Sequence, residues 1–456
     1  MRKKLAVLVA AAMAAASLAG CGGSQNGEAT EQAATAGSES TAAESTEQEA
    51  KSSGGSSSGE MVFSWWGNQT RNERTQQVID LYMEKNPGIS IDGQPSQFSD
   101  YWNKLATAAA GNALPDVLQM DYKYLDQYVD NGLLLDLTPY VESGILDISD
   151  CNEGIIESGK VGDGFYALCI GINAPSLVYS KTVAEQAGVE IKNMMNMDEF
   201  LDTCRQIYEN TGYKTNIAYG DNEPYLEYLL RSKDVTLFED GKMGGEAQDY
   251  VEYFSLYETG IKEGWLIDPS VFVERTKTTE LNPLVYGTSP ENMSWCTFHL
   301  TNQYPVLVNS AAEGNELGLV TWPTNDVTKS NYLKPGQFLA VSKDAKNPEE
   351  AVKFVNWFNN TMECNDILLA ERGIPVSKAV SEALAPKLSA PEQEAIAFVN
   401  DVISPNSTKI NPPAGTGASG VIDLLNQLEE QVCYGQMTAE EAGNKLFEEG
   451  NKMMAK

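Results

Sequence analysis

Positive charge and histidine are both scarce in this sequence. The 456 residues include 32 Lys and Arg against 64 Asp and Glu, which gives a formal net charge of −32. Nucleic acids and anionic membranes are bound through clustered basic side chains, so this composition argues against both as partners. His299 is the only histidine, which excludes a zinc site with several histidine ligands. The length suits a large core, divided into two or at most three domains.

Cysteines with metal-binding spacing are also lacking. Apart from Cys21, the cysteines stand singly, at positions 151, 169, 204, 296, 364 and 433. Without a CxxC pair or another ligand pattern, the sequence predicts no metal site, and we expect no cofactor. Exported proteins can form disulfides, but we favour small buried free thiols.

The first twenty residues have the pattern of an export signal. Three basic residues precede an apolar run from Leu5 to Ala16, which is too short to span a membrane comfortably. The following Leu18–Cys21 segment resembles the lipobox of bacterial lipoproteins. The resemblance implies that residues 1–20 are removed and that Cys21 is lipidated, which would anchor the protein to the outer face of the bacterial cytoplasmic membrane. The alternative is a soluble secreted protein that is cleaved nearby.

Large apolar residues are missing from the next segment. Residues 22–60 contain no Val, Ile, Leu, Met or aromatic residue. Such a segment cannot bury enough apolar surface to offset the entropy lost on ordering. We therefore predict a disordered tether over residues 21–60 and a folded part that begins near Met61.

Strands and helices alternate at the start of the folded part. The pattern predicts strands at 61–66, 89–92 and 116–120, with helices at 75–85 and 100–110 between them. This order is typical of a parallel sheet with right-handed crossovers. Ligands of such sheets bind beyond the carboxyl ends of the strands, which would bring together the loops 66–70, 95–99 and 121–124.

Aromatic and amide side chains dominate these three loops. A sugar offers apolar faces to aromatic rings and hydroxyls to polar partners, so the loops suit a neutral polyhydroxyl ligand. Neighbouring strand residues face opposite sides, so one of Trp65 and Trp66 is expected to point into the core. No basic cluster is evident in the loops, which argues against a phosphate or sulfate ligand.

Several short segments, in order along the folded chain, resemble the extracellular solute-binding proteins of carbohydrate ABC importers, the maltodextrin-binding-like group. The matching segments are Phe63–Gly67, Tyr101–Leu105, Leu114–Val117, Gly132–Leu137, Gly164–Leu168, Leu177–Ser180, Gly318–Pro323, Gly336–Ser342, Asn347–Ala351 and Arg372–Pro375. The resemblance implies a two-lobe α/β fold of the type II periplasmic-binding-protein kind. Each lobe would be a mostly parallel sheet flanked by helices, with the ligand in a cleft between the lobes. It also implies hinge closure on the solute and, as partners, a separate membrane permease and its ATPase.

The family template also predicts how the chain divides between the lobes. We expect three crossings, near 170–172, 295–297 and 335–338. The N-terminal lobe would then combine 61–171 with 298–335, and the C-terminal lobe 172–297 with 336–456. Helical spacing predicts helices at 198–209, 224–231, 348–359, 392–402 and 421–432.

Eleven residues are candidates for contact with the solute. They are Trp65, Trp66, Asn68, Asp121, Tyr124, Tyr219, Asp221, Trp295, Trp322, Gln337 and Arg372. Both Trp295 and Trp322 could instead belong to the core, and Asp221 could be a turn residue. Arg372 could pair with a uronate, or only hold a loop through neighbouring carboxylates. We interpret His299 as structural.

Motifs typical of enzymes occur only in unsuitable places. Residues 55–59 match the GxSxG pattern but lie in the predicted tether. Residues 415–420 match GxGxxG but follow Asn411-Pro412-Pro413 rather than a strand. The sequence therefore predicts no catalytic residue, and indicates a monomeric, non-enzymatic receptor for an oligosaccharide, for which a plant-polysaccharide fragment is one candidate. The alternatives are a non-sugar polar solute or an exported carbohydrate-active enzyme.

Overall fold

The structure is a computed structural model that describes residues 59–217, 222–272, 279–415 and 417–455. The predicted signal peptide, the lipidated Cys21 and nearly all of the predicted tether lie outside the described residues. So do two of the candidate site residues, Tyr219 and Asp221.

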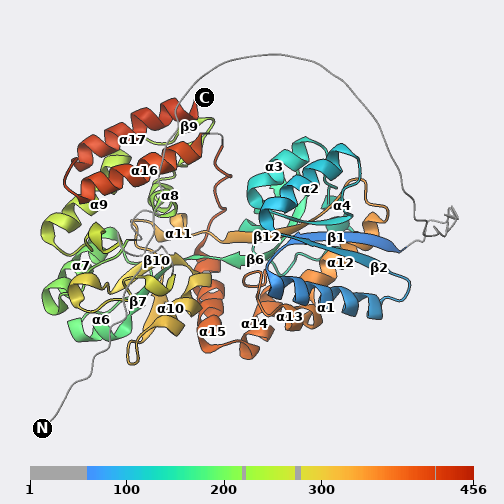
Figure 1. Ribbon diagram of the computed structural model, residues 1–456, viewed down its shortest axis with the longest axis horizontal. Helices are drawn as coiled ribbons and strands as arrows, with labels where there is room; N and C mark the ends of the chain where they lie inside the picture. The colour runs from blue at the N-terminus through green and yellow to red at the C-terminus, as the bar shows by residue number, and fades with distance from the viewer. Residues whose placement is uncertain (1–58, 218–221, 273–278, 416, 456) are drawn as a thin grey trace, which may run out of the picture. The chain divides into compact units, whose positions relative to one another are not determined.

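A five-stranded sheet forms the first half of the fold (Figure 1). Its order is β2-β1-β3-β12-β6, with β1 parallel to β2 and β3, and β12 antiparallel to β3 and β6. The strands are β1 (Glu60–Trp66), β2 (Ser90–Ser96), β3 (Val117–Met120), β6 (Ala167–Asn173) and β12 (Lys334–Val341). The predicted parallel unit of three strands and two helices is therefore confirmed.

Helices on this sheet bury its apolar side chains. In one cluster Phe63 and Trp65 of β1 pack with Ile79 of α1 and with Phe354 of α12. The helices of this half are α1 (Gln69–Lys85), α2 (Phe98–Ala110), α3 (Tyr122–Asp130), α4 (Thr138–Glu142), α5 (Glu153–Ser158), α12 (Pro348–Asn360), α13 (Met362–Leu368) and α14 (Lys378–Leu384). We call this sheet with its helices the first lobe.

A three-stranded sheet forms the second half. Its order is β10-β7-β11, and both neighbours of β7 are antiparallel to it. The strands are β7 (Pro175–Ser180), β10 (Cys296–Leu300) and β11 (Leu317–Val320). The helices of this half are α6 (Lys181–Ala187), α7 (Met197–Thr211), α8 (Glu223–Arg231), α9 (Ala247–Glu263), α10 (Tyr304–Ser310), α11 (Val327–Ser330), α16 (Ala418–Cys433) and α17 (Ala439–Met454). We call this half the second lobe; its sheet is antiparallel, where we expected a mostly parallel one.

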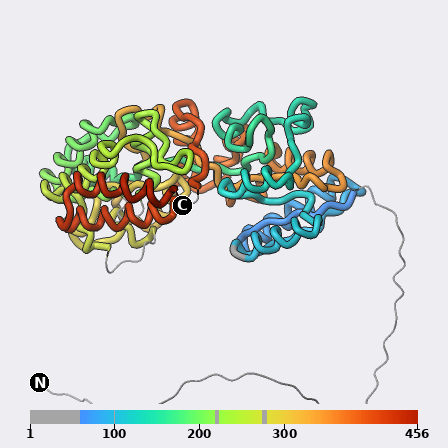
Figure 2. The backbone as a smooth tube through the Cα atoms, turned by 90° about the horizontal axis from the view of Figure 1, so that it is seen from above, coloured from blue at the N-terminus to red at the C-terminus, as the bar shows by residue number. Residues whose placement is uncertain are grey.

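The strand pairing corrects the predicted division of the chain. Residues 298–335 were assigned to the N-terminal lobe, but β10 and β11 pair with β7 in the second lobe. Residues 336–456 were assigned together to the C-terminal lobe, but β12, α12 and α13 pack into the first lobe, and only α16 and α17 pack on α9 of the second. Figure 2 shows the orange segment around residue 350 beside the blue N-terminal elements. Segment order alone did not specify which strands pair, because these partners lie more than a hundred residues apart.

Three passages of chain join the two lobes. The first runs from β6 into β7 at Asn173–Pro175, and the second from β11 to β12. The third follows α15 (Ala390–Ala397) and the adjoining π-helix Phe398–Ile403 and leads to α16. At the first passage the backbones approach closely, because a Cβ on Gly171 would lie 2.1 Å from the carbonyl oxygen of Arg372.

Apart from Cys21, the cysteines are free thiols: Cys151 is half-buried and the others are buried. Burial raises the pKa of the Cys169 thiol to about 12. In the part of the chain that the structure describes, no helix is both long and apolar enough to cross a membrane. The same residues hold no group of three or more His, Cys, Asp or Glu side chains that could bind a metal ion.

Candidate functional site

Two cavities adjoin where the strands cross between the lobes. The first has a volume of about 400 Å³ and the second about 380 Å³, both within the range of small-molecule sites. Asn302 lines both cavities, and Lys334 of the second pairs in the sheet with Asn173 of the first. We call them the arginine cavity and the tryptophan cavity, after the residues described next.

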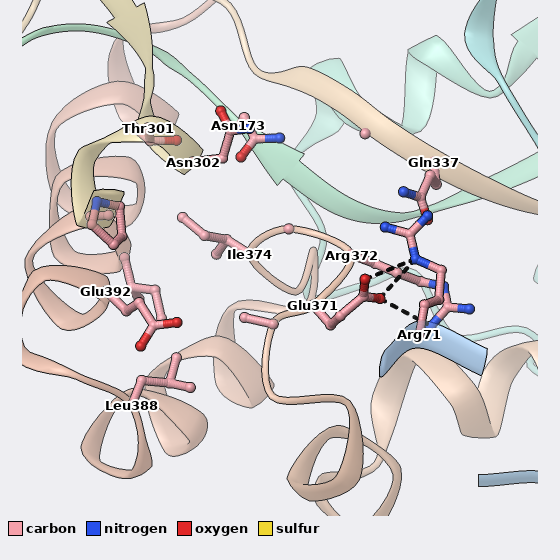
Figure 3. Close-up of a pocket in the computed structure, with 16 residues that line it drawn as sticks. Arg71, Asn173, Thr301, Asn302, Gln337, Glu371, Arg372, Ile374, Leu388 and Glu392 are labelled. Carbon is pink, nitrogen blue, oxygen red and sulfur yellow. Dashed lines mark hydrogen bonds and ion pairs between the residues drawn. The ribbon is translucent and has the colours of Figure 1, made fainter. Parts of the chain in front are cut away.

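The arginine cavity has a charged wall contributed by the first lobe (Figure 3). Arg71 Nε lies 2.8 Å from Glu371 Oε2 and 3.0 Å from Oε1, while its Nη1 donates to the carbonyl oxygen of Trp66 at 3.3 Å. With its amide oxygen turned toward the guanidinium, Gln337 accepts from both Nη atoms at 3.1 Å. These contacts fix the position of Arg71 at the edge of the cavity.

A second guanidinium lies behind the first. The Arg372 side chain is 3% exposed and donates to Gln119 Oε1 at 3.3 Å and to Thr75 Oγ1 at 2.7 Å. Its Nη1 makes no hydrogen bond within the described residues, and lies 3.8 Å from Glu371 Oε2. Burial and then the nearby charge of Arg71 lower the pKa of the Arg372 guanidinium. Two cations therefore share one carboxylate at this wall.

The loop that carries Glu371 and Arg372 is tied to the crossing strand. Ile374 and Ile172 exchange two backbone hydrogen bonds, of 2.8 and 3.0 Å. Just before the loop, Leu369 and Ala370 both have positive φ, a conformation disfavoured for residues with a Cβ. The next turn uses Gly373 at φ +107°, which a glycine adopts readily. The backbone thus holds the charged pair against the passage between the lobes.

Apart from Lys334 of β12, the walls of the tryptophan cavity are mainly aromatic and amide side chains of the second lobe. Trp322 packs against Tyr225, Tyr228 and Phe298, with ring centroids 5.2–5.7 Å apart. Its Nε1 and the Oδ1 of Asn222 are buried and make no hydrogen bond within the described residues. Both residues line the cavity. Because an unpaired buried donor or acceptor is costly, these two atoms are candidates to bind polar groups of a solute once a shift of the surrounding side chains exposes them.

Hydrogen bonds with neighbouring residues of the second lobe fix the side chain of Asn222. Its Nδ2 donates to Glu429 Oε2 at 3.1 Å, and the same oxygen accepts from Tyr253 Oη at 3.0 Å. A hydrogen bond with Tyr257 Oη also fixes the amide group. The orientation of the free amide oxygen thus depends on a buried carboxylate of α16.

Three of the predicted site residues line these cavities: Gln337 and Arg372 in the first, and Trp322 in the second. Trp65 and Trp295 do not, because they are 1% and 0% exposed and lie in the core. Trp65 Nε1 donates to Asn72 Oδ1 and Trp295 Nε1 to Thr215 Oγ1, both at 2.9 Å. Trp65 and Trp295 are therefore core residues and not the cavity contacts that we listed; a core position was the stated alternative for Trp295 and was expected for one of Trp65 and Trp66.

The remaining predicted residues gather at the carboxyl edge of the first sheet. Trp66 lies 5.5 Å from both Phe98 and Trp102, and Trp102 lies 4.1 Å from Tyr124, between ring centroids. The predicted meeting of the three loops is therefore confirmed. Asn68 and Asp121 cap α1 and α3, accepting from the backbone N–H of Arg71 and Lys123. None of the four predicted residues here lines either cavity.

Sequence reasoning missed several residues that line the cavities. Arg71 was overlooked because α1 begins at Gln69, six residues before the predicted start, so that Arg71 lies in its first turn. The signal was available in Asn68, which is a favourable N-cap residue. His299 was interpreted as structural but lines the tryptophan cavity. Further lining residues without a sequence signal are Asn173, Asn302, Lys334, Glu371 and Glu392.

The two lobes, the crossing strands and the polar cavities beside them define a binding protein of the α/β, two-lobed class. A family model described as bacterial extracellular solute-binding protein matches residues 66–362. The match covers well over half of the chain, and the chain therefore belongs to this family.

Individual relatives are distant. An arabinooligosaccharide-binding protein of Halalkalibacterium halodurans is 21% identical over 167 residues, which is 36% of this chain and only 37% of that protein. A family 1 extracellular solute-binding protein of Alicyclobacillus acidocaldarius has a similar structure, with a TM-score of 0.79 and 24% identity over 87% of this chain and 98% of that one. An oligogalacturonide-binding protein of Yersinia enterocolitica has a TM-score of 0.70 and 19% identity over the same shares. These structures support the type II fold predicted from the sequence.

Proposed function

We propose that this protein is the solute-binding component of an ABC importer, and that it captures an oligosaccharide between its two lobes and delivers it to a membrane permease. The main support is the pair of adjoining cavities at the lobe passages, whose walls include buried polar atoms without a hydrogen-bond partner among the described residues. A polyhydroxyl solute supplies donors and acceptors in a small volume, so it could satisfy Trp322 Nε1 and Asn222 Oδ1 together.

Aromatic side chains of the first lobe fit the same kind of solute. Phe98 is 49% exposed, and Trp102 and Tyr124 are half-buried beside it. Exposed aromatic rings offer stacking surfaces for the apolar faces of sugars. We infer that Trp66, Asn68, Asp121 and Tyr124 contribute to this surface, and that Gln337, Arg372 and Trp322 act in the cavities. Sugar binding by the two named relatives, the arabinooligosaccharide- and oligogalacturonide-binding proteins, agrees with this assignment.

The rest of the proposal concerns location and partners. We propose that the protein is exported, lipidated at Cys21 and held at the outer face of the cytoplasmic membrane by a flexible tether. It would act as a monomer without catalysis. Its direct partners would be the permease subunits, and the ATPase would be engaged through them.

The function is tested by ligand-induced stabilisation of the purified protein. Melting temperature and tryptophan fluorescence are measured against neutral and acidic mono- and oligosaccharides, with peptides and other polar metabolites as comparison solutes. A solute at 100 times its dissociation constant is expected to add about 2.7 kcal/mol of stability. Stabilisation by a sugar without product formation is the expected result. Stabilisation only by non-sugar solutes would overturn the carbohydrate assignment, and turnover of an oligosaccharide would identify an enzyme.

The lipid anchor requires a separate experiment. Cells producing the protein are labelled with a fatty acid, and the wild type is compared with Cys21→Ala. We expect label in the wild type alone, and release of the variant from the membrane fraction. Membrane retention and labelling that do not change in the variant would contradict lipidation at Cys21.

A further inference from the structure

At the first-lobe wall of the arginine cavity, positive charges outnumber negative ones. Arg71 and Arg372 face one carboxylate, that of Glu371, and the three side chains are 14%, 3% and 11% exposed. The groups come from distant parts of the chain, since 300 residues separate Arg71 from Glu371. For this reason the pair of arginines could not be recognised from the sequence, where we looked for a basic cluster only in the three loops.

Buried charge without a partner is unfavourable, so this excess calls for a counter-ion. Glu392 lines the same cavity, but it lies across from the arginines in Figure 3. Its Oε2 accepts from the backbone N–H and the hydroxyl of Ser389, at 2.8 and 2.6 Å. Among the described residues, no ion pair joins Glu392 to either arginine. Glu392 therefore leaves the excess charge at the wall unpaired, and an anionic group that enters the cavity would balance it.

We propose that the solute carries a carboxylate, as the sugar ring of a uronic acid does, and that Arg71 binds this group in the arginine cavity. This inference rests on the proposed sugar-binding function and names its substrate class. A guanidinium recognises a carboxylate through parallel N–H donors. The excess at this wall is one positive charge, which a carboxylate with a single negative charge matches better than a doubly charged phosphate.

The geometry also gives Gln337 a role. Its amide oxygen accepts hydrogen bonds from both Nη atoms of Arg71. Because β12 carries Gln337 beside the passage between the lobes, a carboxylate that takes over these donors would lie next to that passage. The Gln337 amide group is then free to donate a hydrogen bond to the same ligand.

The test compares a uronate trisaccharide with the same trisaccharide reduced to its neutral sugar, by calorimetry on the purified protein. We expect the wild type to bind the uronate at least tenfold more tightly. Charge-assisted hydrogen bonds of this kind correspond to about ten- to hundredfold in affinity. Arg71→Ala should lose this preference while it still binds the neutral sugar. A 6-phosphorylated sugar serves as the comparison anion and should bind more weakly than the uronate.

Two further variants separate a charge effect from a folding effect. Glu371→Gln keeps an oxygen that can accept from Arg71 Nε but removes the competing charge, so it should strengthen uronate binding, opposite to Arg71→Ala. Arg205→Ala removes a cation from an exposed ion pair with Glu263 in the second lobe, and should leave the preference unchanged.

The possible results bear separately on the carboxylate, on Arg71 and on the proposed sugar-binding function. Equal binding of the neutral and acidic sugars by the wild type would overturn the carboxylate proposal and leave the sugar-binding function standing. Tighter binding of the phosphorylated sugar would identify a phosphate, and not a carboxylate, as the group that this cavity binds. If none of the sugars binds, the proposed function itself fails. A preference that persists in Arg71→Ala would remove Arg71 as its source.

Discussion

The two lobes contribute different chemistry to the same passage. The first lobe presents a charged wall in which Arg71, Glu371 and Arg372 are fixed by hydrogen bonds. The second lobe presents neutral aromatic and amide groups, Trp322 and Asn222, each with one buried polar atom that has no hydrogen-bond partner in the described part of the chain. This difference suggests a division of labour between the two walls: the aromatic and amide wall would provide affinity for any sugar, and the charged wall would choose among sugars by charge.

The largest expected effect comes from the aromatic wall of the second lobe. Trp322 is 3% exposed and packs on three other rings. Trp322→Ala should lower the free energy of unfolding by about 3–5 kcal/mol, because the removed ring leaves a cavity. Urea unfolding followed by circular dichroism measures this loss. A loss below about 1 kcal/mol would mean that the wall is not part of the core.

Trp322→Phe is the matched variant for binding. It keeps an aromatic ring but removes the Nε1 donor. If the second lobe provides general sugar affinity, this variant should lower the affinity for acidic and neutral sugars by the same factor. Arg71→Ala should lower only the affinity for acidic sugars. A charge-dependent effect of Trp322→Phe would break the proposed division of labour.

A smaller effect is expected at the passage between the lobes. A methyl group on Gly171 would lie 2.1 Å from the backbone oxygen of Arg372, so the strand or the loop must shift. Gly171→Ala should cost about 1–3 kcal/mol of unfolding free energy, as overpacking does. It should also alter the fluorescence change on solute binding, because the charged loop is displaced from the crossing strand.

Gly111→Ala is the control for this substitution. Its Cβ would meet only carbonyl oxygens 3.6 Å away, which is ordinary contact, so stability should be almost unchanged. Equal effects of the two substitutions on unfolding would show that the close approach at Gly171 is not a constraint.

The two lobes also differ in how far the sequence predicted them. The β1–α1–β2–α2–β3 unit could be predicted because each step joins neighbours in the sequence, and its three loops do meet. The second sheet could not, since β10 and β7 lie over a hundred residues apart and their pairing leaves no local pattern. The charged wall could not be predicted for the same reason, because Arg71 and Glu371 become neighbours only through the fold. Local periodicity could not separate Trp65 from Trp66 either, although alternation correctly required one of them to face inward.

The smallest expected effect on stability tests whether the first lobe is limited to charge recognition. Phe98 is 49% exposed, next to Trp66 and Trp102. Phe98→Ala should change the unfolding free energy by only about 0.5 kcal/mol, as is usual for exposed positions. Sugar binding should nevertheless weaken by about 0.5–1.5 kcal/mol, which is the value of an aromatic contact.

Tyr434→Ala supplies the control, because Tyr434 is 42% exposed at the end of α16, in the second lobe. It should leave sugar affinity unchanged. If Phe98→Ala lowers the affinity for neutral and acidic sugars alike, the first lobe combines a stacking surface with recognition of charge. Unchanged affinity would confine its contribution to the arginines, and the second lobe alone would then carry the affinity for neutral rings.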